Sequence, residues 1–148
     1  MNPEKTKVIL IGNSEYPDWG SQRDDPSIPN VKENLKMLKE IFTSALFGIK
    51  EDEDHLVELP EKKSDEILET VSRSLRKTRG MMETLIFYYA GHGIPHQQKG
   101  LFLTTRNTKW DSFEYNSIEA KDLKDLIENS GIPEKIVIID CCLLKTSI

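Results

Sequence analysis

Four short apolar runs alternate along the chain with stretches whose hydrophobic residues recur at helical spacing. The runs are "KVILIG" at 7–12, "HLVEL" at 55–59, "TLIFYYA" at 84–90 and "KIVIID" at 135–140. Continuous apolar runs of this length are typical of strands that are covered on both faces, as in a parallel sheet. Parallel neighbours need long crossover connections, and the helical stretches supply them. The pattern therefore predicts an α/β three-layer sandwich with a mainly parallel central sheet.

The helical stretches carry start and stop residues. In the first, Asn30 is expected to be the N-cap, because Glu33 follows three residues later and would complete a capping box. Glycines that follow apolar periodic stretches predict where helices end. The expected limits are Asn30 to Gly48, Ser64 or Asp65 to Gly80, and Ser117 to Gly131, and the run at 100–105 is expected to form a short hairpin arm.

Length and charge narrow the functional class. The 148 residues fit one domain, 1–148, and the net charge of −5 argues against a nucleic-acid partner. No apolar run approaches the roughly 20 residues of a membrane span, and the first residues lack the apolar core of a signal peptide. We therefore expect a cytoplasmic protein with no membrane partner. Cys141 and Cys142 are adjacent in the chain, so a structural disulfide is not expected.

Two polar motifs directly follow the third and fourth apolar runs. "AGHG" presents His92 between two glycines, on an expected loop, and "DCC" ends with Cys141 and Cys142. The carboxyl ends of parallel strands gather at one edge of a sheet, so an imidazole and a thiol can meet there. Such a pair suits nucleophilic catalysis, with the amides of Gly93 and Cys142 as oxyanion donors. Alternation sends the two cysteines to opposite faces, and spacing alone does not choose between them.

Other interpretations of these residues exist. A histidine after an apolar strand can be a turn residue that binds backbone, and a cysteine near a core strand can be a small hydrophobe. Ligand spacing for a metal is missing around the vicinal cysteines, so no metal site is expected. The acidic run at 51–55 lacks the spaced ligands of a calcium loop. A nucleotide-binding flavodoxin-like protein is disfavoured, because no glycine-rich phosphate cradle is present.

"LIFYYAGHG", followed about 50 residues later by "IVIIDCC", closely resembles the caspase-like peptidases, which include metacaspases and bacterial caspase homologues. The resemblance extends over essentially the whole chain. It implies a caspase-like fold and a cysteine endopeptidase, with His92 as general acid/base and Cys142 as nucleophile. Gly93 would supply an oxyanion amide, and Cys141 would point into the core. Bacterial homologues often serve in signalling or defence, and the likeness implies such a role.

The resemblance also bears on cleavage specificity. Metacaspases, which cleave after Lys or Arg, place an acidic residue two positions before the nucleophile, and Asp140 stands there. Caspases that cleave after Asp place a pocket arginine in the loop after the first strand, where Arg23 lies beside Asp24 and Asp25. We favour basic specificity, because the Asp-x-Cys match is local and ungapped. Asp140, Arg23, Asp24 and Asp25 are thus the candidate substrate-binding residues.

The chain departs from the family pattern after Cys142. Metacaspases continue with His-Ser-Gly, whereas "LLKTSI" follows here, and the C-terminal strands that complete a caspase-like fold are absent from this chain. We therefore expect a large-subunit-like portion of a protease. It would act on protein or peptide substrates when joined to its C-terminal part or to another protomer. The alternative is a catalytically inactive scaffold that binds partners through an exposed sheet edge. No cofactor is implied, and calcium dependence stays open.

Overall fold

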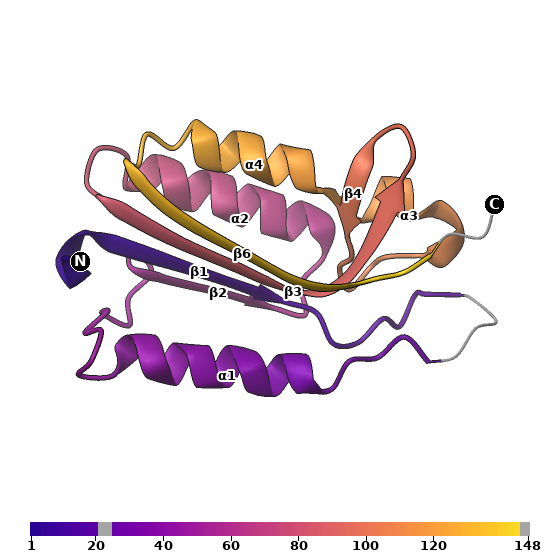
Figure 1. Cartoon of the computed structure of the whole chain (residues 1–148), viewed down its shortest axis with the longest axis horizontal. Coiled ribbons are helices and arrows are strands. Elements are labelled where there is room, and N and C mark those ends of the chain that lie inside the picture. The colour runs from indigo at the N-terminus through magenta and orange to yellow at the C-terminus, as the bar shows by residue number, and fades with distance from the viewer. Residues whose placement is uncertain (21–24, 146–148) are drawn as a thin grey trace.

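The computed structural model describes residues 1–20 and 25–145, and its centre is a six-stranded sheet (Figure 1). Four strands are parallel to one another, and β4 and β5 run antiparallel to their neighbours. The first half of β3 lies between β1 and β6, whereas its second half pairs with β4. The strands are β1 (Thr6–Gly12), β2 (Leu56–Pro60), β3 (Thr84–His96), β4 (Gly100–Leu103), β5 (Ile118–Glu119) and β6 (Glu134–Leu143).

Helices cover both faces of this sheet, so the fold is the expected α/β sandwich. Figure 1 shows α1 on one face and α2 with α4 on the other. The main helices are α1 (Asn30–Thr43), α2 (Ser64–Lys77) and α4 (Ala120–Glu128). Shorter elements are α3 (Phe113–Asn116) and the 3-10 turns η1 (Pro3–Lys5) and η2 (Trp110–Ser112).

Side-chain alternation along the central strands builds two cores. In β1, Val8 and Leu10 belong to the cluster beneath α1, whereas Ile9 and Ile11 belong to the cluster beneath α2 and α4. All seven residues of β1 are buried. Because both faces of the strand are covered, its stretch from Val8 to Ile11 is continuously apolar rather than alternating. The expectation of two covered faces is thereby confirmed for β1, whereas β6, formed by the fourth apolar run, has both faces exposed.

The first helix begins and ends differently from the expectation. Asn30 is the first helical residue, Pro29 takes the N-cap position, and no side-chain cap bond forms. The expected capping box with Glu33 is therefore wrong. Proline suits this place, because its fixed φ fits the first turn of a helix and its missing N–H needs no partner. The helix ends at Thr43, well before Gly48, and the intervening residues form turns.

Strand pairing shortens the third expected helix. The two residues after Ser117 form β5, in which Ile118 pairs with Leu103 and Glu119 with Phe102. Helix α4 therefore begins only at Ala120. Ile118 is 1% exposed, so the strand places an apolar side chain in the core. The hairpin arm expected at 100–105 is confirmed, because β4 pairs antiparallel with the end of β3.

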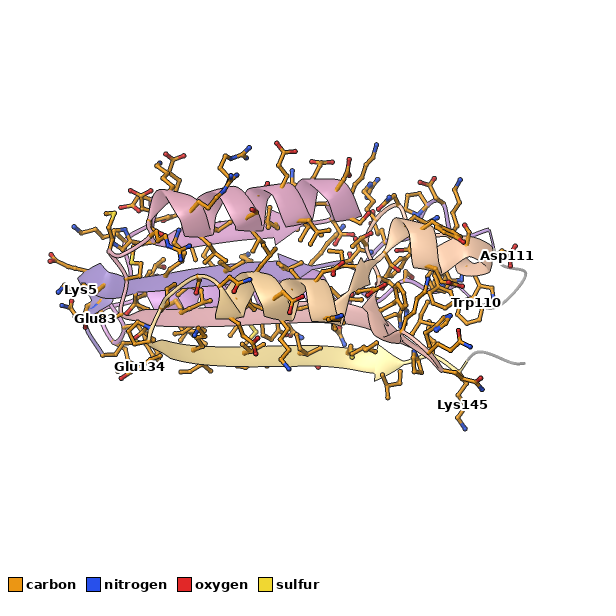
Figure 2. The ribbon with its side chains drawn as sticks, turned by 90° about the horizontal axis from the view of Figure 1, so that it is seen from above. Lys5, Glu83, Trp110, Asp111, Glu134 and Lys145 are labelled. Atoms are coloured by element: carbon orange, nitrogen blue, oxygen red, sulfur yellow. The ribbon has the colours of Figure 1, made fainter. Side chains whose placement is uncertain are left out.

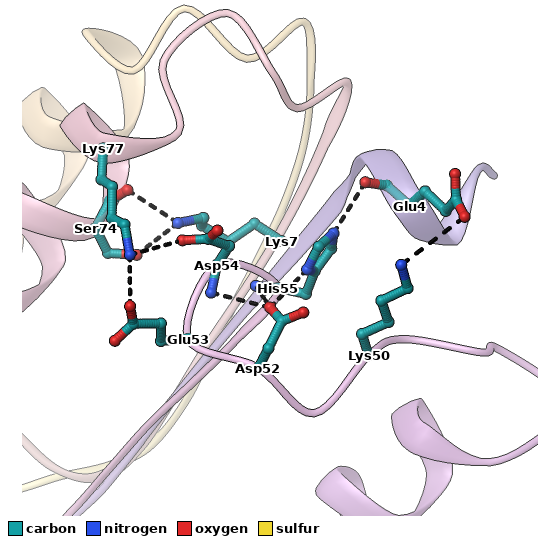
Figure 3. A network of polar contacts seen from close by, with 9 residues as sticks. All are labelled: Glu4, Lys7, Lys50, Asp52, Glu53, Asp54, His55, Ser74 and Lys77. Atoms are coloured by element: carbon teal, nitrogen blue, oxygen red, sulfur yellow. Dashed lines mark hydrogen bonds and ion pairs between the residues drawn. The ribbon is translucent and has the colours of Figure 1, made fainter.

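A buried lysine lies near the amino end of the sheet (Figure 3). The side chain of Lys7 on β1 is fully buried, and its Nζ donates to the carbonyl oxygen of Ser74 at 2.9 Å and to the Ser74 hydroxyl at 2.5 Å. Nearby, Lys77 pairs with Glu53 at 2.5 Å and with Asp54 at 3.1 Å. Burial lowers the pKa of Lys7 to about 8, although the Asp54 carboxylate opposes the shift.

We predict that Lys7 makes stability depend on pH above pH 8. Between about 8 and the ordinary lysine value of 10.5, the unfolded chain holds a proton that the folded chain has lost. The free energy of unfolding should therefore rise with pH in this window, by up to about 3 kcal/mol. Urea unfolding at several pH values measures the slope. Lys7→Met should remove this contribution, whereas Lys5→Met, at an exposed position, should keep it. Equal slopes for Lys7→Met and the parent would contradict the prediction.

Candidate active site

His92 and Cys142 lie side by side on neighbouring strands. In the parallel pairing of β3 with β6, His92 is the register partner of Cys142, as Ala90 is of Asp140. Neighbouring strands lie about 4.8 Å apart, so the two residues are adjacent at the main chain. Both residues lie within strands, not in loops as their glycine-rich and polar surroundings suggest. The pairing of β3 with β4 and β6 prolongs the strand beyond the apolar run.

Alternation gives the two cysteines different surroundings. Cys141 packs against the core cluster beneath α2 and α4, and a Cβ built on Gly93 would lie 2.9 Å from its sulfur. Cys142 is the next residue along β6 and is exposed. On β3, alternation puts His92 on the opposite side from Gly93. Cys142 and His92 therefore share one side of the sheet, and Cys141 lies on the other, as the resemblance implied.

The imidazole of His92 is held by the connection between β1 and α1. Its Nε2 lies 2.6 Å from the carbonyl oxygen of Pro26, which can only accept a hydrogen bond. Nε2 therefore carries the proton in the neutral ring, and Nδ1 carries the lone pair. Nδ1 is buried and has no hydrogen-bond partner among the described residues. The rings of Tyr16 and Trp19 contact the imidazole, with centroids at 5.3 and 6.1 Å.

Burial sets the protonation of this histidine. It lowers the pKa of His92 below the ordinary value, and the hydrogen bond to Pro26 opposes the shift to a smaller extent. The cause is that a charged imidazolium loses hydration among the aromatic rings of the loop. His92 is therefore neutral at pH 7 and able to accept a proton.

The main chain at His92 is fixed on both sides. Its N–H donates to the Tyr16 hydroxyl at 3.2 Å, and its carbonyl accepts from the Thr104 hydroxyl at 2.9 Å and the Thr104 amide at 3.0 Å. Tyr16 and Thr104 share a hydrogen bond of 2.8 Å, and Tyr89 donates to the Thr104 carbonyl at 2.6 Å. A Cβ at Gly91 would collide with the Tyr89 side chain. Glycine is thus required beside His92, because two tyrosines converge there.

Asp140 also faces this side of the sheet. The buried Tyr88 hydroxyl donates to its Oδ2 at 2.9 Å. Burial raises the pKa of Tyr88 to about 12, and the hydrogen bond to the Asp140 carboxylate adds to the shift. Tyr88 consequently stays a hydrogen-bond donor at any ordinary pH. Asp140 is exposed two residues before Cys142, so its carboxylate can meet a charged group from solvent.

The remaining candidate residues are less clustered. Gly93 is buried, and its carbonyl accepts the amide of Leu144 at 2.8 Å. Asp25 is exposed, next to Pro26, and hydrogen bonds from Ser27 lower the pKa of its carboxyl. The candidates Arg23 and Asp24 lie outside the described residues. Over 1–20 and 25–145, no group of three or more His, Cys, Asp or Glu side chains could hold a metal ion.

A model of the caspase domain matches residues 5–146 of the sequence. The chain belongs to the caspase family. This is a family of cysteine peptidases, and the match covers nearly the whole chain. No curated protein matches the sequence significantly. In the part of the chain that the structure describes, no helix is long and apolar enough to cross a membrane.

A solved caspase structure has the same fold. Caspase-1 from Spodoptera frugiperda superposes with a TM-score of 0.64 at 14% sequence identity. The alignment covers 95% of this chain and 48% of that caspase chain. The likeness confirms the caspase-like fold, and this chain spans about half the length of that structure.

Sequence reasoning missed the residues of this caspase-family chain that surround His92. Tyr16, Trp19 and Pro26 contact the imidazole and Thr104 binds the His92 carbonyl, and the fold alone brings these four residues to His92. One signal was available. Tyr16 and Trp19 are two large aromatic side chains in an otherwise polar connection, and both are 6% exposed. Buried aromatic side chains in a long loop indicate that the loop packs against something.

We predict that the two cysteines react at different rates. Cys142 is exposed, whereas burial raises the pKa of Cys141, and the neighbouring Cys142 and Asp140 add to that shift. Iodoacetamide at pH 8 should therefore alkylate Cys142 roughly fivefold faster or more, because only a thiolate reacts. Cys141→Ser and Cys142→Ser each leave one thiol, and mass spectrometry follows its modification. Faster alkylation of Cys141 would contradict the alternation described above.

Proposed function

We propose that the protein is a cysteine endopeptidase in which His92 and Cys142 act as a dyad. The observation that carries the proposal is the pairing of these residues in the register of β3 and β6, on one side of the sheet. Support also comes from the free lone pair at His92 Nδ1, which is buried without a partner among the described residues. A buried acceptor without a donor suits a group that receives a proton during a reaction.

The proposed reaction follows from these groups. His92 Nδ1 takes the thiol proton, and the Cys142 thiolate attacks the carbonyl carbon of the substrate peptide bond. The amides of Gly93 and Cys142 donate to the resulting oxyanion. The carbon–nitrogen bond then breaks, and His92 returns its proton to the leaving amine. Water, deprotonated by His92, hydrolyses the thioester and regenerates the thiol. The Pro26 carbonyl stabilises the imidazolium through Nε2–H.

The proposal includes a preference for Lys or Arg before the cleaved bond. Asp140 is exposed two residues before Cys142 and offers a carboxylate to a cationic side chain. The Tyr88 hydroxyl holds one carboxylate oxygen at 2.9 Å, which orients the group while leaving the other oxygen available. Preference for Asp would depend on Arg23, which lies outside the described residues.

We further propose that β6 pairs with a C-terminal part of the protein or with another protomer. Figure 2 shows β6 along one margin of the sheet, between Glu134 and Lys145. Among the described strands, β6 pairs with β3 alone, and both its faces are exposed. Its large apolar side chains are 38–63% exposed: Ile136, Val137, Ile138, Ile139 and Leu143. An unpaired apolar edge of this kind is suited to accept another strand.

The same exposed edge favours a second candidate, an inactive scaffold that binds partners through β6. The two candidates differ in what they require of His92. A scaffold needs no free imidazole lone pair beside a thiol, whereas a peptidase does. The peptidase is therefore preferred, and peptide cleavage separates the two.

We predict that the full natural protein cleaves peptides after Arg or Lys and not after Asp. Cys142→Ala and His92→Ala should each lower kcat/KM by at least about 1,000-fold, because they remove the nucleophile and its base. Cys141→Ala, the matched control, should retain activity. Fluorogenic peptides ending in Arg, Lys or Asp measure the rates, with and without calcium. Cleavage that survives Cys142→Ala would contradict the dyad, and silence toward every peptide would favour the scaffold.

The electrostatic role of Asp140 can be tested without peptide cleavage. In a Cys141→Ser background, Cys142 should react faster with cationic aminoethyl methanethiosulfonate than with its anionic sulfonatoethyl analogue. Asp140→Asn should lower this rate ratio about threefold at low salt, because the carboxylate attracts cations. Tyr88→Phe should keep the ratio near that of the parent, since the charge remains. A ratio that is unchanged by Asp140→Asn would argue against a cation-binding role.

A further inference from the structure

His92 makes two hydrogen bonds to the β1–α1 connection, and both depend on the position of Ser14. The His92 N–H donates to the Tyr16 hydroxyl, which lies in the first described part of this connection. The His92 Nε2–H donates to the Pro26 carbonyl, which lies in the second. Ser14 joins the two parts, because its carbonyl accepts the amide of Ile28 at 2.8 Å. The position of Ser14 therefore bears on both ends of the histidine.

Glu61 holds Ser14 in place. Its carboxylate accepts the Ser14 amide at 2.7 and 3.0 Å, one distance to each oxygen, and the Glu15 amide at 2.8 Å. The Glu61 amide in turn donates to the Gly12 carbonyl at 2.9 Å, at the end of β1. The side chain thus binds successive backbone amides, and no ion pair to it is found in the described part of the chain. A carboxylate bound by amides in this way makes charge-assisted, well-oriented hydrogen bonds.

The backbone at Glu61 indicates that this contact outweighs a local cost. Its φ is 52°, in the left-handed region, and it is the only described residue other than glycine with a positive φ. Glycine or asparagine adopts this conformation at lower cost than glutamate. A glutamate there brings strain with it, and strain of this kind gathers at positions where the surrounding structure requires a particular geometry. The conformation turns the chain after β2, so that the carboxylate faces the β1–α1 connection.

We propose that Glu61 is a positioning residue for His92, acting through the Ser14 and Glu15 amides to hold the connection that carries Tyr16, Trp19 and Pro26. The inference rests on the proposed function, in which His92 is the base. Glu61 touches neither the imidazole nor the thiol. Its role is to keep the aromatic rings and the Pro26 carbonyl against the imidazole, so that Nε2 stays protonated and Nδ1 stays free.

The titration of His92 reports this role independently of peptidase activity. The chain has three histidines, so the imidazole C–H signals in NMR spectra are few, and His92→Gln assigns one of them. In Glu61→Ala, the pKa of His92 should rise toward the ordinary value, because the imidazole becomes hydrated when the connection loosens. Loss of a nearby negative charge alone would lower it instead. A rise in the pKa of His92 would therefore indicate that the connection has moved, whereas a fall would indicate only the loss of the Glu61 charge.

Two further variants sharpen this test. Glu61→Gly adopts the left-handed backbone without strain but lacks the carboxylate, so it should shift the pKa of His92 as Glu61→Ala does. Its melting temperature should be higher than that of Glu61→Ala, because glycine tolerates this conformation better than alanine. Glu58→Gln removes a charge from the same strand, β2, at a residue that pairs with Lys39, and should leave the titration unchanged. An unchanged titration in Glu61→Ala, or a wild-type titration in Glu61→Gly, would overturn the proposal.

A second measurement distinguishes failure of this inference from failure of the proposed function. In a Cys141→Ser background, alkylation of Cys142 by iodoacetamide at pH 7 should slow roughly 3- to 10-fold in Glu61→Ala, since the base is displaced. His92→Ala should slow it at least as much. Equal rates in His92→Ala and its parent would refute the dyad, whatever the titration shows. A slow His92→Ala with an unaffected Glu61→Ala would refute the role of Glu61 alone.

Discussion

The parallel pairing of β3 with β6 is the interaction on which the candidate site depends. It aligns Tyr88 with Ile138, Ala90 with Asp140 and His92 with Cys142. Because side chains alternate along a strand, a shift of one residue would replace Cys142 by Cys141 or Leu143 opposite His92. Within this pair, burial fixes the position of β3, whereas both faces of β6 are exposed. Phe87 and Tyr89 are fully buried under α2 and α4, and their removal from this core would cost several kcal/mol.

Around this register, the structure holds His92 through its backbone as much as through its ring. Tyr16 binds its amide, Thr104 binds its carbonyl, and Pro26 binds Nε2. Tyr16 and Pro26 belong to the connection after β1 and Thr104 to the segment after β4, so two segments that are distant in sequence meet at His92 on β3. A histidine that is held at its amide, its carbonyl and Nε2 loses little freedom on reacting, which would suit the proposed role of His92 as a base. The buried tyrosine hydroxyls explain why glycine flanks the histidine at position 91.

The apolar runs were sufficient to predict the four parallel strands and the sandwich, and the residues that follow them predicted His92 and a cysteine as candidates, whereas the choice of Cys142 over Cys141 came from the resemblance to caspase-like peptidases. The sequence was insufficient for features that depend on distant partners. The segment around His92 has the glycines of a loop, yet pairing with β4 and β6 makes it a strand. Asn30 has the sequence of a cap, yet Pro29 occupies that position. Glu61 carries no local signal at all, since its partners are amides 46 and 47 residues earlier in the chain.

The exposure of β6 and the burial of His92 belong together in a peptidase. In the proposed mechanism a peptide must reach the nucleophile, so Cys142 would need a strand that is open on at least one side, whereas a neutral base would need a protected ring. The sheet meets both needs by placing the thiol on the marginal strand and the imidazole on the central one. A strand added beside β6 would cover the apolar side chains of Ile136 and Ile138. Because Asp140 and Cys142 continue the same alternation toward the carboxyl end, that strand would also form a wall beside them. The proposed pairing at β6 and the proposed substrate site are thus two consequences of one open edge.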